Sequence, residues 1–171
     1  LIDLKVYMDP DEGLRRHWKT RRDQESRGHT PDEVRDQIER RLPDARRHIR
    51  PQRAFADWIV RYVPATPIDE TAAPDVAAPA IRVQHVLRND LPVEAFVAEL
   101  EGLPNVRVTW DLHPDLERQL LEVEGSPSAA DVRAVASRLF PLFAESLGVE
   151  EVAWQAGQAG VQQLVFALLL Q

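Results

Sequence analysis

Four cationic side chains lie at helical spacing near the N-terminus: Arg15, Lys19, Arg22 and Arg27. On an α-helix, residues at i, i+4 and i+7 share one face, so the first three form a row and Arg27 follows about one turn later. Arginine binds phosphate oxygens through a planar guanidinium, and lysine binds them as a point charge. The spacing therefore indicates an element that can hold a phosphate-rich ligand.

A second interpretation is a solvated, charged helix face. Three pairs of opposite charge stand at i, i+4 in the same stretch: Asp11–Arg15, Glu12–Arg16 and Asp23–Arg27. Each such pair stabilises a helix by about 0.2–0.5 kcal/mol. Charged helix faces are common, so spacing alone favours this interpretation over a ligand site.

Two linked motifs resemble a known family. Residues 18–30 read Trp-Lys-x-x-Arg-Asp-x-x-x-Arg-Gly-His-Thr, and residues 51–57 read Pro-Gln-Arg-x-Phe-Ala-Asp before an apolar run. The first resembles the lid segment of phosphoribulokinases, and the second resembles the segment that leads into a strand of these enzymes. The Arg-Asp-x-x-x-Arg-Gly core is shared with uridine kinases. The glycine-containing apolar tail of the chain is weakly similar to the phosphoribulokinase tail.

The resemblance implies an enzyme that transfers the γ-phosphoryl group of MgATP to ribulose 5-phosphate, giving ribulose 1,5-bisphosphate. Lys19 and Arg22 match lid positions that reach the transferring phosphate, so they are the expected catalytic residues. Arg27 matches a position that holds the sugar phosphate, and Arg15, on the same face, is expected to bind substrate with it. Glu25 and Ser26 replace the usual Ala-Glu, which leaves a uridine kinase-like nucleoside kinase open as an alternative.

The phosphate loop of such a kinase is missing from the sequence. Gly157 and Gly160 lack the Lys-Ser/Thr of that motif, so they indicate close packing or a turn. The five histidines show no metal-ligand spacing. We therefore expect the chain to be the C-terminal part of a longer kinase, with the MgATP site mostly outside it and no activity by itself. A non-catalytic dimerisation or regulatory module is the alternative from a different class.

Composition and charge limit the class of protein further. The 171 residues include no cysteine, which excludes disulfides and thiolate metal sites and suits the reducing cytoplasm. Residues 1–63 hold 15 Lys and Arg against 12 Asp and Glu, whereas residues 64–171 hold 6 against 16. The acidic second half argues against nucleic-acid binding, and no apolar run is long enough to span a membrane. The expected partners are ATP, a sugar phosphate and a second copy of the chain in a homodimer.

Periodicity and turn residues predict the elements that carry these motifs. We expect an α/β fold: the C-terminal part of a P-loop kinase-like sheet with a helical lid (1–63), a Pro/Ala linker (64–80) and a small α+β domain (81–171). The predicted strands are 2–8, 55–62, 81–88, 105–112 and 116–123. The predicted helices are 10–27, capped by Asp9, then 31–42, ended or kinked by Pro43, then 92–100, 128–147 and the tail 157–170.

Overall fold

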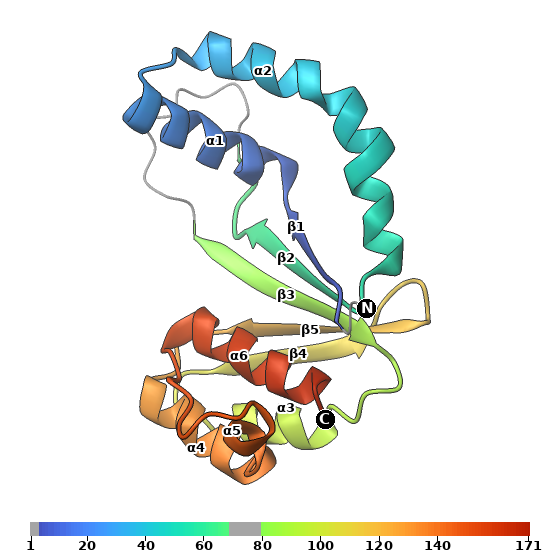
Figure 1. Cartoon of the computed structure of the whole chain (residues 1–171), viewed down its shortest axis with the longest axis vertical. Helices are drawn as coiled ribbons and strands as arrows, with labels where there is room; N and C mark the ends of the chain where they lie inside the picture. The colour runs from blue at the N-terminus through green and yellow to red at the C-terminus, as the bar shows by residue number, and fades with distance from the viewer. Residues whose placement is uncertain (1–3, 69–79) are drawn as a thin grey trace. The chain divides into compact units, whose positions relative to one another are not determined.

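The computed structural model describes residues 4–68 and 80–171. Its contacts divide the chain into an N-terminal unit, residues 1–87, and a C-terminal unit, residues 88–171. The described residues form a mixed α/β structure with five strands and six α-helices, in agreement with the predicted class (Figure 1). Most of the predicted linker, residues 69–79, lies outside the described residues.

The sheet of the N-terminal unit has three strands: β1 (Val6–Pro10), β2 (Trp58–Pro64) and β3 (Ile81–Arg88), whose last residue lies at the unit boundary. β1 pairs with β2 in parallel, with Val6 opposite Trp58. β2 pairs with β3 in antiparallel orientation, with Trp58 opposite Leu87. The predicted linker at 64–80 would place β3 in the second domain. The pairing with β2 instead joins β3 to the N-terminal unit.

Helix α1 (Glu12–Arg27) begins two residues later than predicted. Asp9 and Pro10 belong to β1, because the Asp11 N–H continues the parallel pairing by donating to the Tyr62 carbonyl at 2.8 Å. Asp11, rather than Asp9, is the N-cap, and its Oδ1 accepts from the Leu14 N–H at 3.2 Å. Gly28 ends the helix with a left-handed φ of 67°, as predicted.

Helix α2 (Pro31–Asp44), predicted over 31–42, begins with a capping box in which Thr30 and Glu33 satisfy each other's backbone N–H groups. Its buried face consists of Val34, Ile38 and Leu42. Pro43 does not end the helix. The chain continues as a π-helical turn, η1 (Ala45–Ile49), and a 3₁₀ segment, η2 (Arg50–Phe55), and the ribbon changes direction there (Figure 1).

Neither η1 nor η2 has a buried residue. Phe55, which we predicted to open a strand, lies in η2 with 72% of its surface exposed. A proline cannot donate the helical hydrogen bond, and the π and 3₁₀ turns accommodate the resulting break. The strand β2 starts at Trp58. Just before it, the Asp57 N–H donates to the Lys5 carbonyl and Asp57 Oδ2 accepts the Lys5 N–H, where Lys5 directly precedes β1.

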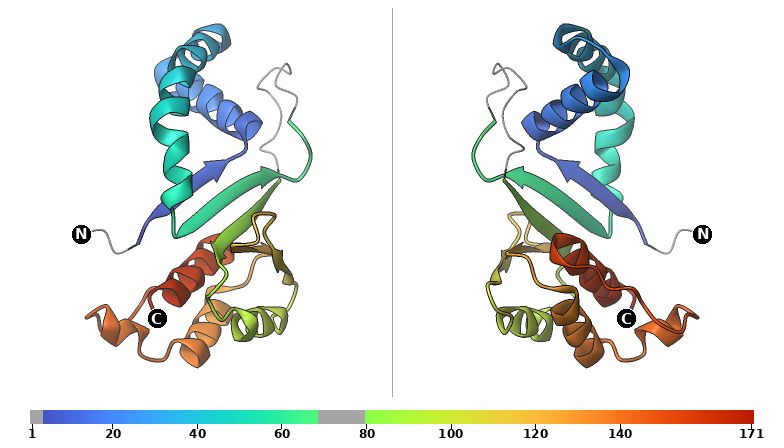
Figure 2. Two further views of the ribbon diagram at one scale, coloured as in Figure 1. Left: turned by 90° about the vertical axis from the view of Figure 1, so that its right-hand side faces the viewer. Right: turned by 90° about the vertical axis from the view of Figure 1, so that its left-hand side faces the viewer.

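The C-terminal unit joins a β-hairpin to helices. β4 (Arg107–Leu112) and β5 (Arg118–Glu124) pair in antiparallel orientation, as predicted. Helix α3 (Glu94–Glu101) contacts β4, and α4 (Ala129–Leu139) contacts both α3 and α6 (Gly157–Leu169). Figure 2 shows these helices gathered on one side of the hairpin.

Two predictions for this unit have different outcomes. The helix predicted over 128–147 is divided into α4 and a short α5 (Phe143–Ser146), because Pro141 cannot continue the helical hydrogen bonds. The tail is helical, as predicted. Within it, a Cβ on Gly160 would overlap the Gln155 carbonyl and the Val132 side chain, so this glycine permits close packing of α6 on α4.

Candidate functional site

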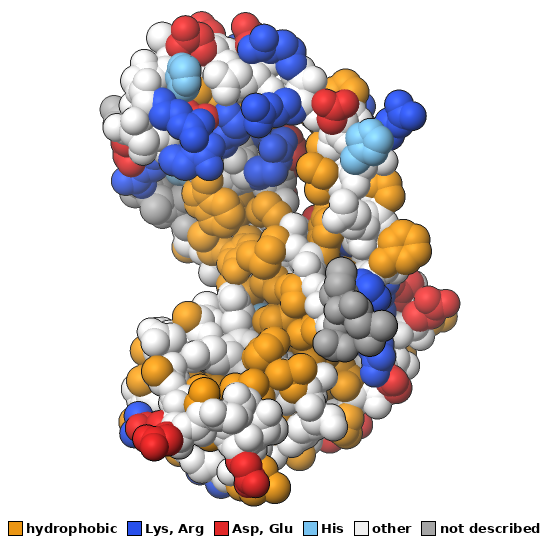
Figure 3. All heavy atoms as spheres, viewed as in Figure 1, with side chains coloured by type: hydrophobic (Ala, Val, Ile, Leu, Met, Phe, Trp, Pro, Cys, Tyr) orange, Lys and Arg blue, Asp and Glu red, His pale blue; other side chains and the backbone are white. Residues whose placement is uncertain are grey.

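Helix α1 carries the cationic patch that the sequence indicated (Figure 3). The helix is fixed to the sheet at its first half. Leu14 is fully buried, and the Trp18 ring packs edge-on against Tyr62 of β2, with 5.9 Å between ring centroids. Trp18 therefore packs α1 against the sheet, and the cationic side chains project from a helix held at this point.

Three of the four predicted cations meet at one carboxylate. Asp23 accepts from Lys19 Nζ at 2.7 Å and from Arg22 Nε at 3.0 Å, and Arg27 Nη1 lies 3.3 Å from it. The Asp23 side chain is fully buried, whereas Lys19 is 17% exposed and both arginines are 58% exposed. The carboxylate thus gathers three positive charges and leaves the arginines open to solvent.

These contacts lower the pKa of Asp23 to about 2, first through the hydrogen bond from Lys19 and then through that from Arg22, against the opposing effect of burial. Asp23 is therefore ionised throughout the physiological range. One negative charge balances three positive ones, so the cluster has an excess of positive charge for an anionic ligand. Guanidinium has five N–H donors, and Asp23 engages a minority of those on Arg22 and Arg27.

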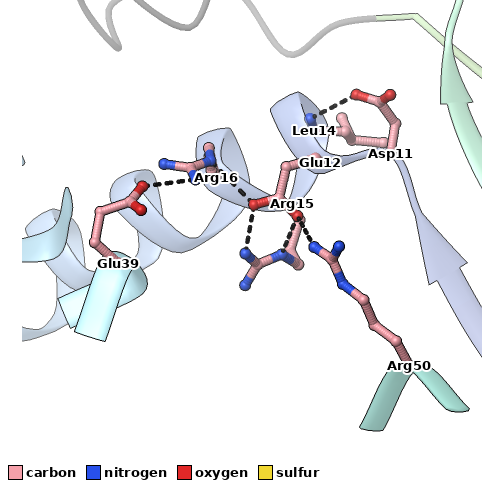
Figure 4. Close-up of polar contacts among 7 residues, drawn as sticks. All are labelled: Asp11, Glu12, Leu14, Arg15, Arg16, Glu39 and Arg50. Carbon is pink, nitrogen blue, oxygen red and sulfur yellow. Dashed lines mark hydrogen bonds and ion pairs between the residues drawn. The ribbon is translucent and has the colours of Figure 1, made fainter. Parts of the chain in front are cut away.

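Arg15 lies apart from this cluster. It pairs with Glu12, with Nη2 2.6 Å and Nε 3.0 Å from the carboxylate (Figure 4). The same carboxylate accepts from Arg16 at 3.0 Å and lies 3.6 Å from Arg50 of η2. The predicted Asp11–Arg15 pair does not form, because Asp11 caps the helix instead. The Glu12–Arg16 and Asp23–Arg27 pairs are present, so two of the three ion pairs of the charged-face interpretation form.

Lys19 also connects helices α1 and α2. Its Nζ lies 3.2 Å from Gln37 Oε1 on α2, and nearby Arg16 bonds to Glu39 of α2 at 2.7 Å. Both contacts cross from α1 to α2. The position of the Lys19 ammonium is therefore set by both helices.

Sequence reasoning did not identify Asp23 as the centre of the site. We assigned it only a pair with Arg27. The sequence did hold a signal. Asp23 has a cationic residue four positions before it (Lys19), one position before it (Arg22) and four positions after it (Arg27). The first and last of these positions lie one helical turn before and after Asp23 on its own face.

We predict that Asp23 stabilises the fold above about pH 4 and ceases to do so as the pH falls to about 2. Its pKa in the folded state is about 2 and its ordinary value is 3.8, so the unfolded chain takes up its proton first. Asp23→Asn should lower the urea midpoint at pH 7 and weaken the pH dependence between pH 4 and 2. Asp36→Asn, at an exposed position of α2, is the control, and an equal loss in both variants would contradict the prediction.

Other candidate residues have structural roles. Asp57 Oδ2 accepts the Lys5 N–H at 2.8 Å and so orients the backbone beside the start of β2. His29 lies 3.7 Å from Glu33 beside the α2 cap. Within residues 4–68 and 80–171, no group of three or more His, Asp or Glu side chains could hold a metal ion. No helix in this part of the chain is long and apolar enough to cross a bilayer.

Comparison with known proteins confirms the family resemblance for the N-terminal segment. Residues 1–69, which contain the whole cationic cluster, match the family model of the Phosphoribulokinase / Uridine kinase family, a family of P-loop kinases. The N-terminal segment is therefore similar to the proteins of this family.

Several similar proteins are phosphoribulokinases. The phosphoribulokinase of Synechocystis sp. is 36% identical over 70 residues, which cover 41% of this chain and 21% of that protein. The chloroplastic enzymes of Chlamydomonas reinhardtii and Arabidopsis thaliana are each 31% identical over 88 residues, or 52% of this chain. The chain spans about a fifth of the length of the curated relatives that it matches.

Proposed function

We propose that this chain is the lid-bearing part of an ATP-dependent kinase that phosphorylates ribulose 5-phosphate. The observation that carries the proposal is the cluster of Lys19, Arg22 and Arg27 on one buried carboxylate, inside the segment that matches a kinase family. The name of the similar proteins supports the choice of acceptor.

The proposed roles follow from the charges. Phosphoryl transfer needs few covalent steps from the protein, and its catalysis consists mainly of positioning and charge stabilisation. Lys19 and Arg22 would donate hydrogen bonds to the transferring phosphoryl group. Arg27 would bind the sugar phosphate. The substrate-binding role of Arg15 stays a prediction, because Arg15 pairs with Glu12 apart from the cluster. Asp23 would hold the first three cations in place, so that little reorganisation is needed when the ligands arrive.

ATP would supply the phosphoryl group, and the chain supplies part of its site. The clustered cations suit phosphate oxygens. However, the sequence has no Gly-x-x-x-x-Gly-Lys-Ser/Thr, the motif whose backbone N–H groups surround the β- and γ-phosphates. In this proposal, the remaining parts of the MgATP site come from residues outside the chain. The expectations of a homodimer and of a domain boundary at 64–80 remain predictions.

The test is a kinase assay on the complete polypeptide that contains this chain. We expect MgATP-dependent release of ADP with ribulose 5-phosphate and much less with uridine. A preference for uridine would establish the nucleoside kinase alternative. If neither acceptor supported ADP release by a folded protein, the kinase proposal would fail and the interaction module would take its place.

A further inference from the structure

A cleft of about 630 Å³ in the N-terminal unit has a second set of arginines. It lies at the carboxyl end of β1, where Asp9 and Pro10 form one wall with the first turn of α1. The opposite wall is formed by Ile49, Arg50 and Arg53 of η1 and η2. Its volume is typical of small-molecule sites, and the carboxyl ends of strands are where α/β folds bind ligands.

Four guanidinium groups line this cleft: those of Arg15, Arg50, Arg53 and Arg61. They come from α1, η2 and β2. Two carboxylates hold them in position. Asp9 lies 3.0 Å from Arg53 and 3.8 Å from Arg61, and Glu12 holds Arg15 and Arg50. The third carboxylate of the lining, Asp11, is engaged as the α1 cap.

Many donors of these arginines remain available. Among the described residues, the guanidinium of Arg50 makes no hydrogen bond, and its one ion pair, with Glu12, spans 3.6 Å. Arg15 uses Nε and Nη2 on Glu12, and Arg53 uses Nε on Asp9, so three guanidinium groups still offer terminal nitrogens. Three such groups suit the three terminal oxygens of a phosphate monoester.

The cleft also has an apolar part. Met8 and Ile49 line it, and each is 54% exposed, so an apolar group in the cleft would remove their surface from water. An inorganic ion would leave these side chains in water. A phosphate ester with an apolar body would contact both parts of the cleft.

We propose that this cleft is an anion-binding site for a small organic phosphate, which Arg15, Arg50 and Arg53 bind and for which Glu12 competes. The phosphate group lies among the three guanidinium groups, and the organic group lies against Met8 and Ile49. When the ligand binds, Arg50 exchanges the Glu12 carboxylate for phosphate oxygens, and the terminal nitrogen of Arg15 that does not contact Glu12 donates to the same phosphate. The proposal does not depend on the kinase function, because binding here requires neither ATP nor catalysis.

The test uses Met8 as a reporter. It is the single methionine of the chain, so a ¹³C-methyl-methionine label gives one NMR signal from the cleft. The full chain is titrated with phenyl phosphate at constant ionic strength, with inorganic phosphate and phenol as comparisons. We expect a saturable shift with phenyl phosphate, weaker binding of inorganic phosphate and no saturable shift with phenol.

Variants separate a defined site from general attraction of anions. Arg50→Gln and Arg53→Gln should each weaken phenyl phosphate binding by about fivefold to tenfold, since each removes a charge-assisted donor. Glu12→Gln should tighten binding, because it removes the competing carboxylate. Arg35→Gln is the matched control, since Arg35 is an exposed arginine of α2 outside the cleft. Circular dichroism confirms folding of each variant.

Several outcomes would overturn the proposal. A shift that does not saturate, or an equal shift with phenol, would show that Met8 reports no phosphate site. Equal weakening by Arg35→Gln and Arg50→Gln would show general electrostatic attraction. Weaker binding by Glu12→Gln would show that Glu12 supports the site rather than competing for it. None of these results would bear on the ADP-release assay, so the two proposals can fail separately.

Discussion

Replacing Arg22 by alanine should lower kcat of the complete kinase by about 10²–10³ and leave both KM values nearly unchanged. Arg22 directs Nε and Nη2 to Asp23, at 3.0 Å and 2.9 Å, and is 58% exposed, so part of its fork remains for a ligand. A donor that acts when charge spreads over the transferring phosphoryl group affects kcat rather than binding. Arg22→Lys should recover part of the activity, because an ammonium group cannot replace the planar fork.

Arg27→Ala in the same assay should mainly raise KM for the sugar phosphate. Arg21→Ala is the control, since Arg21 neighbours Arg22, is half exposed and pairs only locally with Glu25 among the described residues. It should have wild-type kinetics. If Arg22→Ala and Arg27→Ala were folded and kinetically normal as well, the cluster would be a charged surface, and the assignment of Lys19, Arg22 and Arg27 to the reaction would be wrong.

The N-terminal unit should lose stability as the pH falls from about 6.5 to about 4, because His85 is buried in a neutral form. Burial lowers its pKa from 6.5 to about 4, so the unfolded chain binds a proton in this range before the folded chain does. The Nδ1 atom of His85 accepts from Trp58 Nε1 at 3.2 Å, and protonation there would remove the acceptor. The loss should be as much as about 3 kcal/mol by pH 4.

Urea unfolding at a series of pH values measures this effect. His85→Leu should abolish most of the pH dependence between 6.5 and 4, although it leaves the Trp58 N–H without its acceptor. His48→Gln, at an exposed position of η1, should retain the wild-type dependence. Parallel pH curves for wild-type protein and His85→Leu would show that His85 is not the group responsible.

Local signals in the sequence predicted the elements well where the determining contacts are themselves local. The capping boxes at Thr30 and Ser128, the left-handed Gly28 and the apolar spacing of α2 each depend on residues within a few positions. The failures have distant or competing causes. The start of α1 is displaced by a hydrogen bond from Asp11 to Tyr62, a residue of another strand that local pattern cannot reveal.

The candidate site was predicted to a similar degree. Resemblance selected Lys19, Arg22 and Arg27, which the structure brings together, and the match over residues 1–69 confirms the family part of the prediction. The separate position of Arg15 was not predicted. Its partner could have been Asp11 or Glu12, at i−4 or i−3, and the capping role of Asp11 decided between them.

The parallel pairing of β1 with β2 has a consequence for how the helices between them can move. Parallel neighbours cannot be joined by a tight turn, so residues 11–57 are the crossover between these strands. This crossover is tethered at both ends, by Asp11 to Tyr62 and by Asp57 to Lys5. A segment fixed at two points has fewer degrees of freedom than a flap on one hinge. Its displacement must be absorbed internally, and residues 45–55, which bury no side chain, are where bending costs least.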